Sequence, residues 1–268
     1  MTIGLPKTVT KLYSKLKIPR SLEKKLFKSY SYYLNRYVKI WTWYNYDRHN
    51  AASLHPLKIL WIDPQEIEYG TYRKQIEEID GTLLPKVLNG DWDEENTYRI
   101  KKRLRYKAMK QHFRDEVPWE ETQHYKLKKR DLEEKGKTSY GGEVSSEEQL
   151  KERYAQIDDL YHKIAENGYK TQREIKDKGE IVNAKLRPDH YANELNEISV
   201  DIGKEGEIIF EENRHRFYIA KILELKKIPV RILVRHKEWQ EKRNKAVEQP
   251  ETLDEKFRDH PDIEYLNS

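Results

Sequence analysis

The stretch from Ile198 to Arg235 constrains the fold most strongly, because its hydrophobic residues change period along a short run of chain. Its first apolar residues alternate with polar ones, which is typical of a half-buried strand. Two glycines then mark a turn, and a later Ile-Pro step ends a helical pattern. The order of strands at 198–202, 208–210 and 230–234, with a helix at 214–226, predicts an α+β fold with a small mixed sheet.

The start of the predicted helix carries three cationic or titratable residues. Asn213 is a good N-cap, and Arg214, His215 and Arg216 follow it in the first turn. The free amides and the dipole at this end of a helix favour negative charge, so basic side chains here suggest an anion bound from outside. The alternative is that the two preceding glutamates, which include Glu212, neutralise the arginines locally.

These residues resemble a known motif. The run Glu-Asn-Arg-His-Arg, followed by a helix and Ile-Pro-Val, is similar to the core of the ParB/sulfiredoxin fold. The related free-serine kinases carry Asp-Gly-x-His-Arg, so His215 and Arg216 match their His-Arg pair. Asn213 stands where these families have glycine, and asparagine tolerates left-handed backbone best among the other residues. The resemblance implies a phosphate loop formed by Asn213, Arg214, His215 and Arg216.

Two other segments resemble parts of the same domain. The run from Leu57 to Arg73 resembles its first strand and proline-marked turn. A predicted helix from 145 to 167 ends at Gly168, and in the ParB family the next stretch enters the sheet as a strand and faces the nucleotide. Gln172 and Arg173 are therefore expected in the same cleft as the loop. The alternative is that Arg173 pairs with Glu174 or Asp177 on the surface.

The resemblance divides the chain into parts. A ParB-type domain is expected to be split between 57–75 and 145–243. An N-terminal amphipathic helical extension at 1–56, a helical insert at 76–144 and a flexible tail at 244–268 complete the predicted organisation.

The branches of the fold imply different chemistry. Sulfiredoxin chemistry requires a cysteine, and this chain has none. The chromosome-partition branch adds a Glu-Asn-x-x-Arg clamp and a helix-turn-helix domain after Ile-Pro-Val, and neither is present. The kinase-like branch uses His-Arg for phosphates and a glutamate near the first strand as base. The expected function is therefore binding of a nucleotide (ATP, ADP or CTP, with Mg²⁺) or a phosphorylated small molecule, and phosphotransferase or NTP hydrolase activity is consistent with it.

Several acids are candidates for that chemistry. Glu66 and Glu68 lie near the expected base, but neither falls cleanly on its position. Glu212 is a candidate catalytic acid or metal ligand. Asp91 and Asp93 flank a tryptophan and could hold a divalent metal, although Asp93 at a helix start is more often a cap.

A long helix at 21–46 is predicted from aromatic residues at helical spacing, interleaved with lysines and arginines. Packing of this stripe on the core is the favoured interpretation. Nucleic-acid stacking and a membrane-interface helix are the alternatives. With a net charge of +5, a nucleic-acid-binding protein, with nuclease activity as one version, is the rival function, and a non-catalytic interaction module is a third hypothesis.

Compartment and assembly are less constrained. No secretory signal or membrane-spanning run is apparent and cysteine is absent, so a cytoplasmic protein is expected. The oligomeric state stays open.

Overall fold

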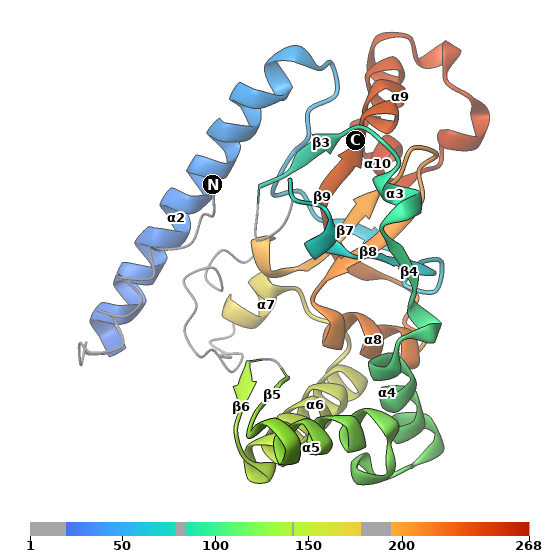
Figure 1. The fold of residues 1–268 in the computed structure, drawn as a ribbon. Helices are drawn as coiled ribbons and strands as arrows, with labels where there is room; N and C mark the ends of the chain where they lie inside the picture. Colours follow the sequence, from blue (N-terminus) through green and yellow to red (C-terminus); the bar gives the residue numbers. More distant parts are fainter. Residues whose placement is uncertain (1–19, 79–83, 141, 178–193, 268) are drawn as a thin grey trace.

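The computed structural model describes residues 20–78, 84–140, 142–177 and 194–267. In these residues seven strands form one mixed sheet, with helices packed against it (Figure 1), which confirms the predicted α+β class. The strands are β1 (Leu60–Ile62), β2 (Tyr69–Thr71), β3 (Lys86–Leu88), β4 (Thr97–Arg99), β7 (Ile198–Ile202), β8 (Ile208–Glu212) and β9 (Ile228–His236). A separate hairpin joins β5 (Thr138–Ser139) to β6 (Glu143–Val144).

The longest strand, β9, organises the sheet. The strand order is β1-β9-β7-β8-β2-β4, and β3 also pairs with β9. Neighbours β7 and β9 are parallel, as are β8 and β2, while β7 and β8 are antiparallel. Because β1 and β3 pair with opposite ends of β9 and β7 pairs along its middle, all nine residues of β9 are buried.

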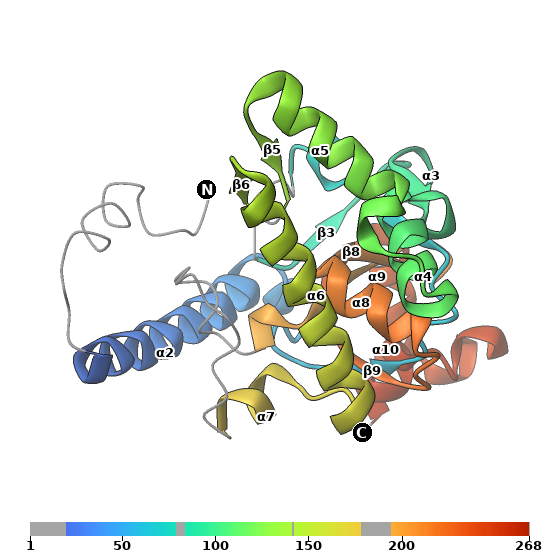
Figure 2. The ribbon, with the colours of Figure 1, turned by 90° about the horizontal axis from the view of Figure 1, so that it is seen from below.

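One face of the sheet packs against helices from distant parts of the chain. Ile198, Val200 and Ile202 of β7 contribute alternate side chains to this core, as their period-two pattern predicts. Phe210 of β8 stacks on Phe217 of the following helix, with ring centroids 4.4 Å apart. Helix α8 (Arg214–Ile222) lies on this face, and α4 (Leu104–Asp115) and α6 (Glu147–Asn167) pack against α8. Helix α5 (Gln123–Lys135) packs against α4 and α6, and α4 lies beside α8 in both views (Figures 1 and 2).

The helix after Asn213 ends earlier than its hydrophobic pattern suggests. It was expected to reach residue 226, but α8 ends at Ile222. Glu224 has a left-handed φ of 54°, and the Leu225 amide donates back to the carbonyl of Ala220. This closing turn buries the apolar residues of the sequence pattern without continuing the helix.

Residues 76–144 are not a purely helical insert, which corrects the sequence-based division. Strand β3 pairs with β9, and β4 pairs with β2 at the edge of the main sheet. Each strand has three residues, too few for their alternation to stand out beside charged helical segments. The expected strand after Gly168 is also absent from the described residues: 172–177 form a helix, α7 (Gln172–Asp177).

The N-terminal helix is present as α2 (Arg20–Asn45), but the favoured packing of its aromatic stripe on the core is wrong for Tyr33, Tyr37 and Tyr44, which are exposed. Trp41 of the same stripe packs beside Val38 in a small separate cluster. Residues 1–19 of the expected extension lie outside the described residues. Among the described helices, none combines the length and the apolar character that crossing a bilayer requires.

The C-terminal segment is ordered, which corrects the expectation of a flexible tail at 244–268. Helix α9 (Lys237–Glu248) follows β9, and the chain returns to place α10 (Pro261–Glu264) against the sheet. Asp262 of α10 is fully buried and accepts hydrogen bonds from Arg235 at 2.8 and 2.9 Å and from the Trp239 indole at 2.9 Å. Burial opposes ionisation of Asp262, but Arg235 and Arg243 outweigh it and hold its pKa below the ordinary value.

Replacing Asp262 is therefore expected to destabilise the whole sheet. The change Asp262→Ala leaves two buried guanidinium groups without their carboxylate, which costs about 3–5 kcal/mol in the free energy of unfolding. Urea denaturation measures this loss, with Asp259→Ala as the control because Asp259 is exposed in the same segment. Equal stabilities for the two variants would show that the tail is not docked.

Candidate functional site

The predicted loop begins at Asn213, where the backbone is left-handed with φ 71° and ψ 46°. This conformation agrees with asparagine standing at a position where related motifs have glycine. The Asn213 amide Nδ2 donates to the carbonyl of Glu197 at 2.6 Å, which fixes β8 and the helix start to the segment before β7. No side chain caps α8, so its N-terminal amides are left without an internal acceptor.

The structure brings two more of the predicted residues to the same place, around Glu197. The Gln172 backbone N–H donates to Glu197 Oε1 at 2.5 Å, and Arg216 Nη1 lies 3.5 Å from Glu197 Oε2. Arg216 also donates to the carbonyl of Asn196. Burial raises the pKa of Glu197 to about 7, and Arg216 opposes this shift. Arg216 is therefore paired within the protein, but with Glu197 and not with the two preceding glutamates, which pair with Arg73.

Arg173 is also paired within the protein. Its guanidinium forms an ion pair with Glu194, not with the neighbouring acids in sequence that were the expected alternative. It lies close to Gln172 but projects from α7 as a surface residue.

Arg214, in contrast, belongs to a group of arginines without carboxylates. It opens α8, and Arg103 and Arg105 lie at the start of the adjacent α4. All three act electrostatically on the Tyr218 hydroxyl. Within the described residues, none of the three forms an ion pair with an acid. Arg103 and Arg105 lie instead against the rings of Tyr98 and Tyr140, each 4.7 Å from the ring centroid.

Buried polar atoms without partners lie in this group. The Tyr218 side chain is fully buried and Tyr98 is 8% exposed, yet neither hydroxyl has a hydrogen-bond partner in the described structure. The His215 Nε2 atom is also buried and unpartnered. Such atoms normally find partners, so each one requires an explanation. Together with the unpaired arginines, they form the candidate anion site: Tyr98, Arg103, Arg105, Arg214, His215 and Tyr218.

Protonation in the anion site follows from burial and from the arginines. Burial raises the pKa of Tyr218, and Arg214, Arg103 and Arg105 oppose the rise. The hydroxyl therefore stays protonated and can donate. Burial lowers the pKa of His215 to about 3, and Arg105 and Arg214 lower it further, so the imidazole is neutral at pH 7.

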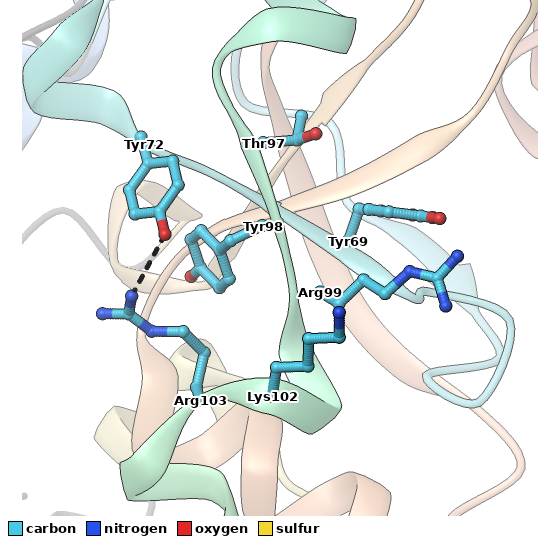
Figure 3. A pocket seen from close by; sticks show the side chains of 7 residues that line it. All are labelled: Tyr69, Tyr72, Thr97, Tyr98, Arg99, Lys102 and Arg103. Atoms are coloured by element: carbon cyan, nitrogen blue, oxygen red, sulfur yellow. Dashed lines mark hydrogen bonds between the residues drawn. The ribbon is translucent and has the colours of Figure 1, made fainter.

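A pocket with a volume of about 390 Å³ opens beside the anion site. Figure 3 shows Tyr72 and Tyr98 on one side of β4 and Tyr69 with Arg99 on the other, while Arg103 reaches the Tyr72 hydroxyl at 3.4 Å. The Tyr98 ring lies across Gly70 of β2, where an added Cβ would be 2.6 Å from the ring. Gly70 therefore allows Tyr98 to take its place between the pocket and the anion site.

Sequence reasoning identified Arg214 and His215 but missed the α4 side of the anion site. Residues 101–105 read Lys-Lys-Arg-Leu-Arg between two tyrosines, a basic run with aromatic neighbours. That signal is present in the sequence, but it lies within the expected helical insert at 76–144. Only the packing of α4 on α8 shows that Arg103 and Arg105 approach the start of α8.

The remaining candidate acids do not gather into a metal site. Glu66 and Glu68 are exposed in the loop between β1 and β2, whose carbonyls accept hydrogen bonds from Lys221 in the last turns of α8. Glu212 adjoins Asn213 and pairs with Arg73 at 3.0 Å. In the described residues, no group of three or more His, Cys, Asp or Glu side chains could hold a metal.

Of the two carboxylates flanking Trp92, Asp93 has a structural contact. Asp93 accepts a hydrogen bond from the Lys204 amide at 2.7 Å, which anchors the turn between β7 and β8. Asp93 is thus not the cap of its helix, α3 (Trp92–Glu95); Asp91 holds that position, without a side-chain hydrogen bond.

A second set of buried charges lies on the sheet itself. Asp201 of β7 accepts a hydrogen bond from Thr71 at 2.7 Å, and Glu211 of β8 pairs with Arg73 at 2.8 Å. Burial raises the pKa of Asp201 to about 7 and that of Glu211 to about 8, and for Glu211 the neighbouring Asp201 adds to the rise. Arg231, fully buried beside them, favours the ionised forms.

Comparison with known proteins finds no matching family model, curated protein or solved structure. The resemblance to the ParB/sulfiredoxin fold therefore stays a prediction.

The raised carboxyl pKa values predict that stability falls as pH rises above neutrality. A carboxyl group whose pKa is higher in the folded state than in the unfolded state stabilises the fold fully only below its unfolded pKa, about 4. This contribution to the free energy of unfolding is lost as the pH rises from that value to the folded pKa. Buried histidines such as His215 act in the opposite sense, but only below about pH 6.5. Between pH 6.5 and 8.5 the melting temperature should therefore decline, and the double variant Asp201→Asn, Glu211→Gln should show a shallower decline. A slope that is unchanged in this variant would contradict the assignment.

Proposed function

We propose that this protein binds a phosphate-bearing ligand, foremost a nucleotide such as ATP, ADP or CTP with Mg²⁺, in the anion site. The observation that carries the proposal is the meeting of Arg103, Arg105 and Arg214, none paired with an acid in the described residues, at an uncapped helix start. A helix N-terminus with basic side chains is suited to phosphate oxygens.

The hydrogen-bonding groups of the anion site are mainly donors, which suits an anion and not a cation. Guanidinium groups only donate, and the Tyr98 and Tyr218 hydroxyls are buried without a hydrogen-bond partner in the described residues. A phosphate supplies several acceptors at once and forms charge-assisted hydrogen bonds with arginine. It would thereby satisfy the polar atoms that the protein alone leaves without partners.

The adjoining pocket favours a ligand that is larger than phosphate. Its lining combines Tyr69 and Tyr72 with Arg99, Lys102 and Arg103, and Arg103 belongs to both pocket and anion site. Tyrosine rings can stack on a nucleobase while the arginines bind its phosphates. Glu212 is the acid nearest in sequence to the loop, so we propose it as the Mg²⁺ ligand or base if phosphoryl transfer occurs.

Removing single arginines from the anion site should separate binding from stability. Each of Arg105→Ala and Arg214→Ala removes charge-assisted hydrogen bonds, which is expected to weaken nucleotide affinity by about 1.5–3 kcal/mol, roughly 10- to 150-fold. The free energy of unfolding should stay unchanged or rise, because Arg214 is disfavoured by the helix dipole. Isothermal titration calorimetry with ATP, ADP and CTP, with and without Mg²⁺, measures the first quantity, and urea denaturation measures the second.

Two further variants complete this experiment. Arg130→Ala, on the exposed side of α5, controls for a general loss of positive charge. Arg216→Ala should lower stability instead, because it leaves the buried Glu197 without its cation. The proposal fails if the wild-type protein gives neither heat nor a melting shift with any of these nucleotides, or if Arg216→Ala alone abolishes binding at unchanged stability.

A further inference from the structure

Helix α2 carries most of the exposed hydrophobic surface of the described chain. Six of the nine large hydrophobic side chains that are exposed in these residues lie on α2. They occupy one side of the helix, while the buried Val38 and Thr42 lie on the opposite side, where Val38 packs with Leu84 and Leu195. Figures 1 and 2 show that α2 lies beside the rest of the fold with one flank uncovered by other described elements. Contiguous exposed apolar surface of this kind marks an interaction site.

The same helix is positively charged and has one acid, Glu23, near its start. Residues 24–46 contain five lysines or arginines and no aspartate or glutamate. The cations lie among the rings: Arg36 Nη1 donates to the Tyr32 hydroxyl at 3.3 Å, and the Arg48 guanidinium lies 4.0 Å from the Tyr44 ring centroid. Charge complementarity therefore requires an anionic partner with flat apolar groups.

A groove runs along the base of this surface. It has a volume of about 560 Å³ and lies between α2 and the segment around Arg173. Its lining includes Tyr32, Arg36, Lys39 and Arg173, and its one acid, Glu194, is paired with Arg173. Three cations thus border a cavity that is continuous with the aromatic face through Tyr32 and Ile40.

We propose that the α2 face and this groove bind single-stranded nucleic acid. Bases would stack on Tyr33, Tyr37 and Trp43, and the phosphates would follow Arg36 and Lys39. Residues four apart on a helix are separated by about 6 Å along its axis, so successive rings can accept successive unstacked bases. This surface is distinct from the anion site, and neither assignment depends on the other.

The side-chain chemistry favours nucleic acid over a membrane or a second copy. An interfacial membrane helix separates its apolar face from its charged face, whereas Arg36 lies between exposed rings. Among the α2 side chains that the structure describes, Ile40 is the single exposed aliphatic one. A symmetric contact between two α2 helices would bring the same cations near each other, with Glu23 as the one acid of each helix to compensate them.

Fluorescence anisotropy with labelled 15-nucleotide RNA and DNA strands tests the proposal. The wild-type protein should bind single strands more tightly than a matched duplex, and the binding constant should fall steeply between 50 and 300 mM KCl. Tyr37→Ala and Trp43→Ala should each weaken binding about tenfold, which is the usual effect of losing one stacked base. Both residues are exposed, so circular dichroism should show an unchanged fold. Trp61→Ala, an exposed tryptophan on β1, is the matched control and should leave affinity unchanged.

Three outcomes would overturn this assignment. The first is binding that is flat in salt or equal in wild type and both α2 variants. The second is binding to vesicles containing anionic lipid, with no binding to oligonucleotides. The third is a dimer, detected by analytical ultracentrifugation, that becomes a monomer in the Trp43→Ala variant, again with no binding of oligonucleotides. Arg105→Ala should bind oligonucleotides like wild type, which separates this surface from the anion site.

Discussion

The buried strand β9 carries two arginines, and much of the structure depends on how their charges are compensated. The free-energy cost of burying an unpaired charge exceeds the stabilisation from most single contacts. Other segments of the chain must therefore place acidic side chains beside the arginines of β9. Asp262 does so for Arg235 and for Arg243 of α9, with both ion pairs almost fully buried. Arg231 lies among Ser199, Asp201 and Glu211 on the neighbouring strands. This requirement explains why the C-terminal segment folds back and why the sheet holds carboxyl groups with raised pKa values.

The arginines of α4 and α8 differ from those of β9. The buried guanidinium groups of Arg235 and Arg243 each have a carboxylate and a carbonyl within hydrogen-bond distance. Arg103, Arg105 and Arg214 lack carboxylates in the described residues, although buried hydroxyls and a helix start lie beside them. The contrast within one protein is the reason to assign these three residues to a ligand and Arg216, with its Glu197, to the fold.

Local periodicity was sufficient to predict the central strands and α8, because the spacing of apolar residues in a long run shows which side chains are buried. It failed where long-range contacts decide the structure. Three-residue strands such as β4 are stabilised by pairing with β2, and the polar tail is ordered by one buried carboxylate, Asp262. In the anion site, Arg214 and His215 were visible from their place in the helix. Arg105 and Tyr218 were not, because their proximity results from packing of α4 on α8.

The most direct test of the central claim is an NMR titration that observes the arginine Nε–H groups with ADP or pyrophosphate. The account predicts saturable shifts for Arg103, Arg105 and Arg214, and small ones for Arg235 and Arg243, whose side chains are held by Asp262. Shifts confined to Arg216, or no shift in any of the three at saturating ligand, would contradict it.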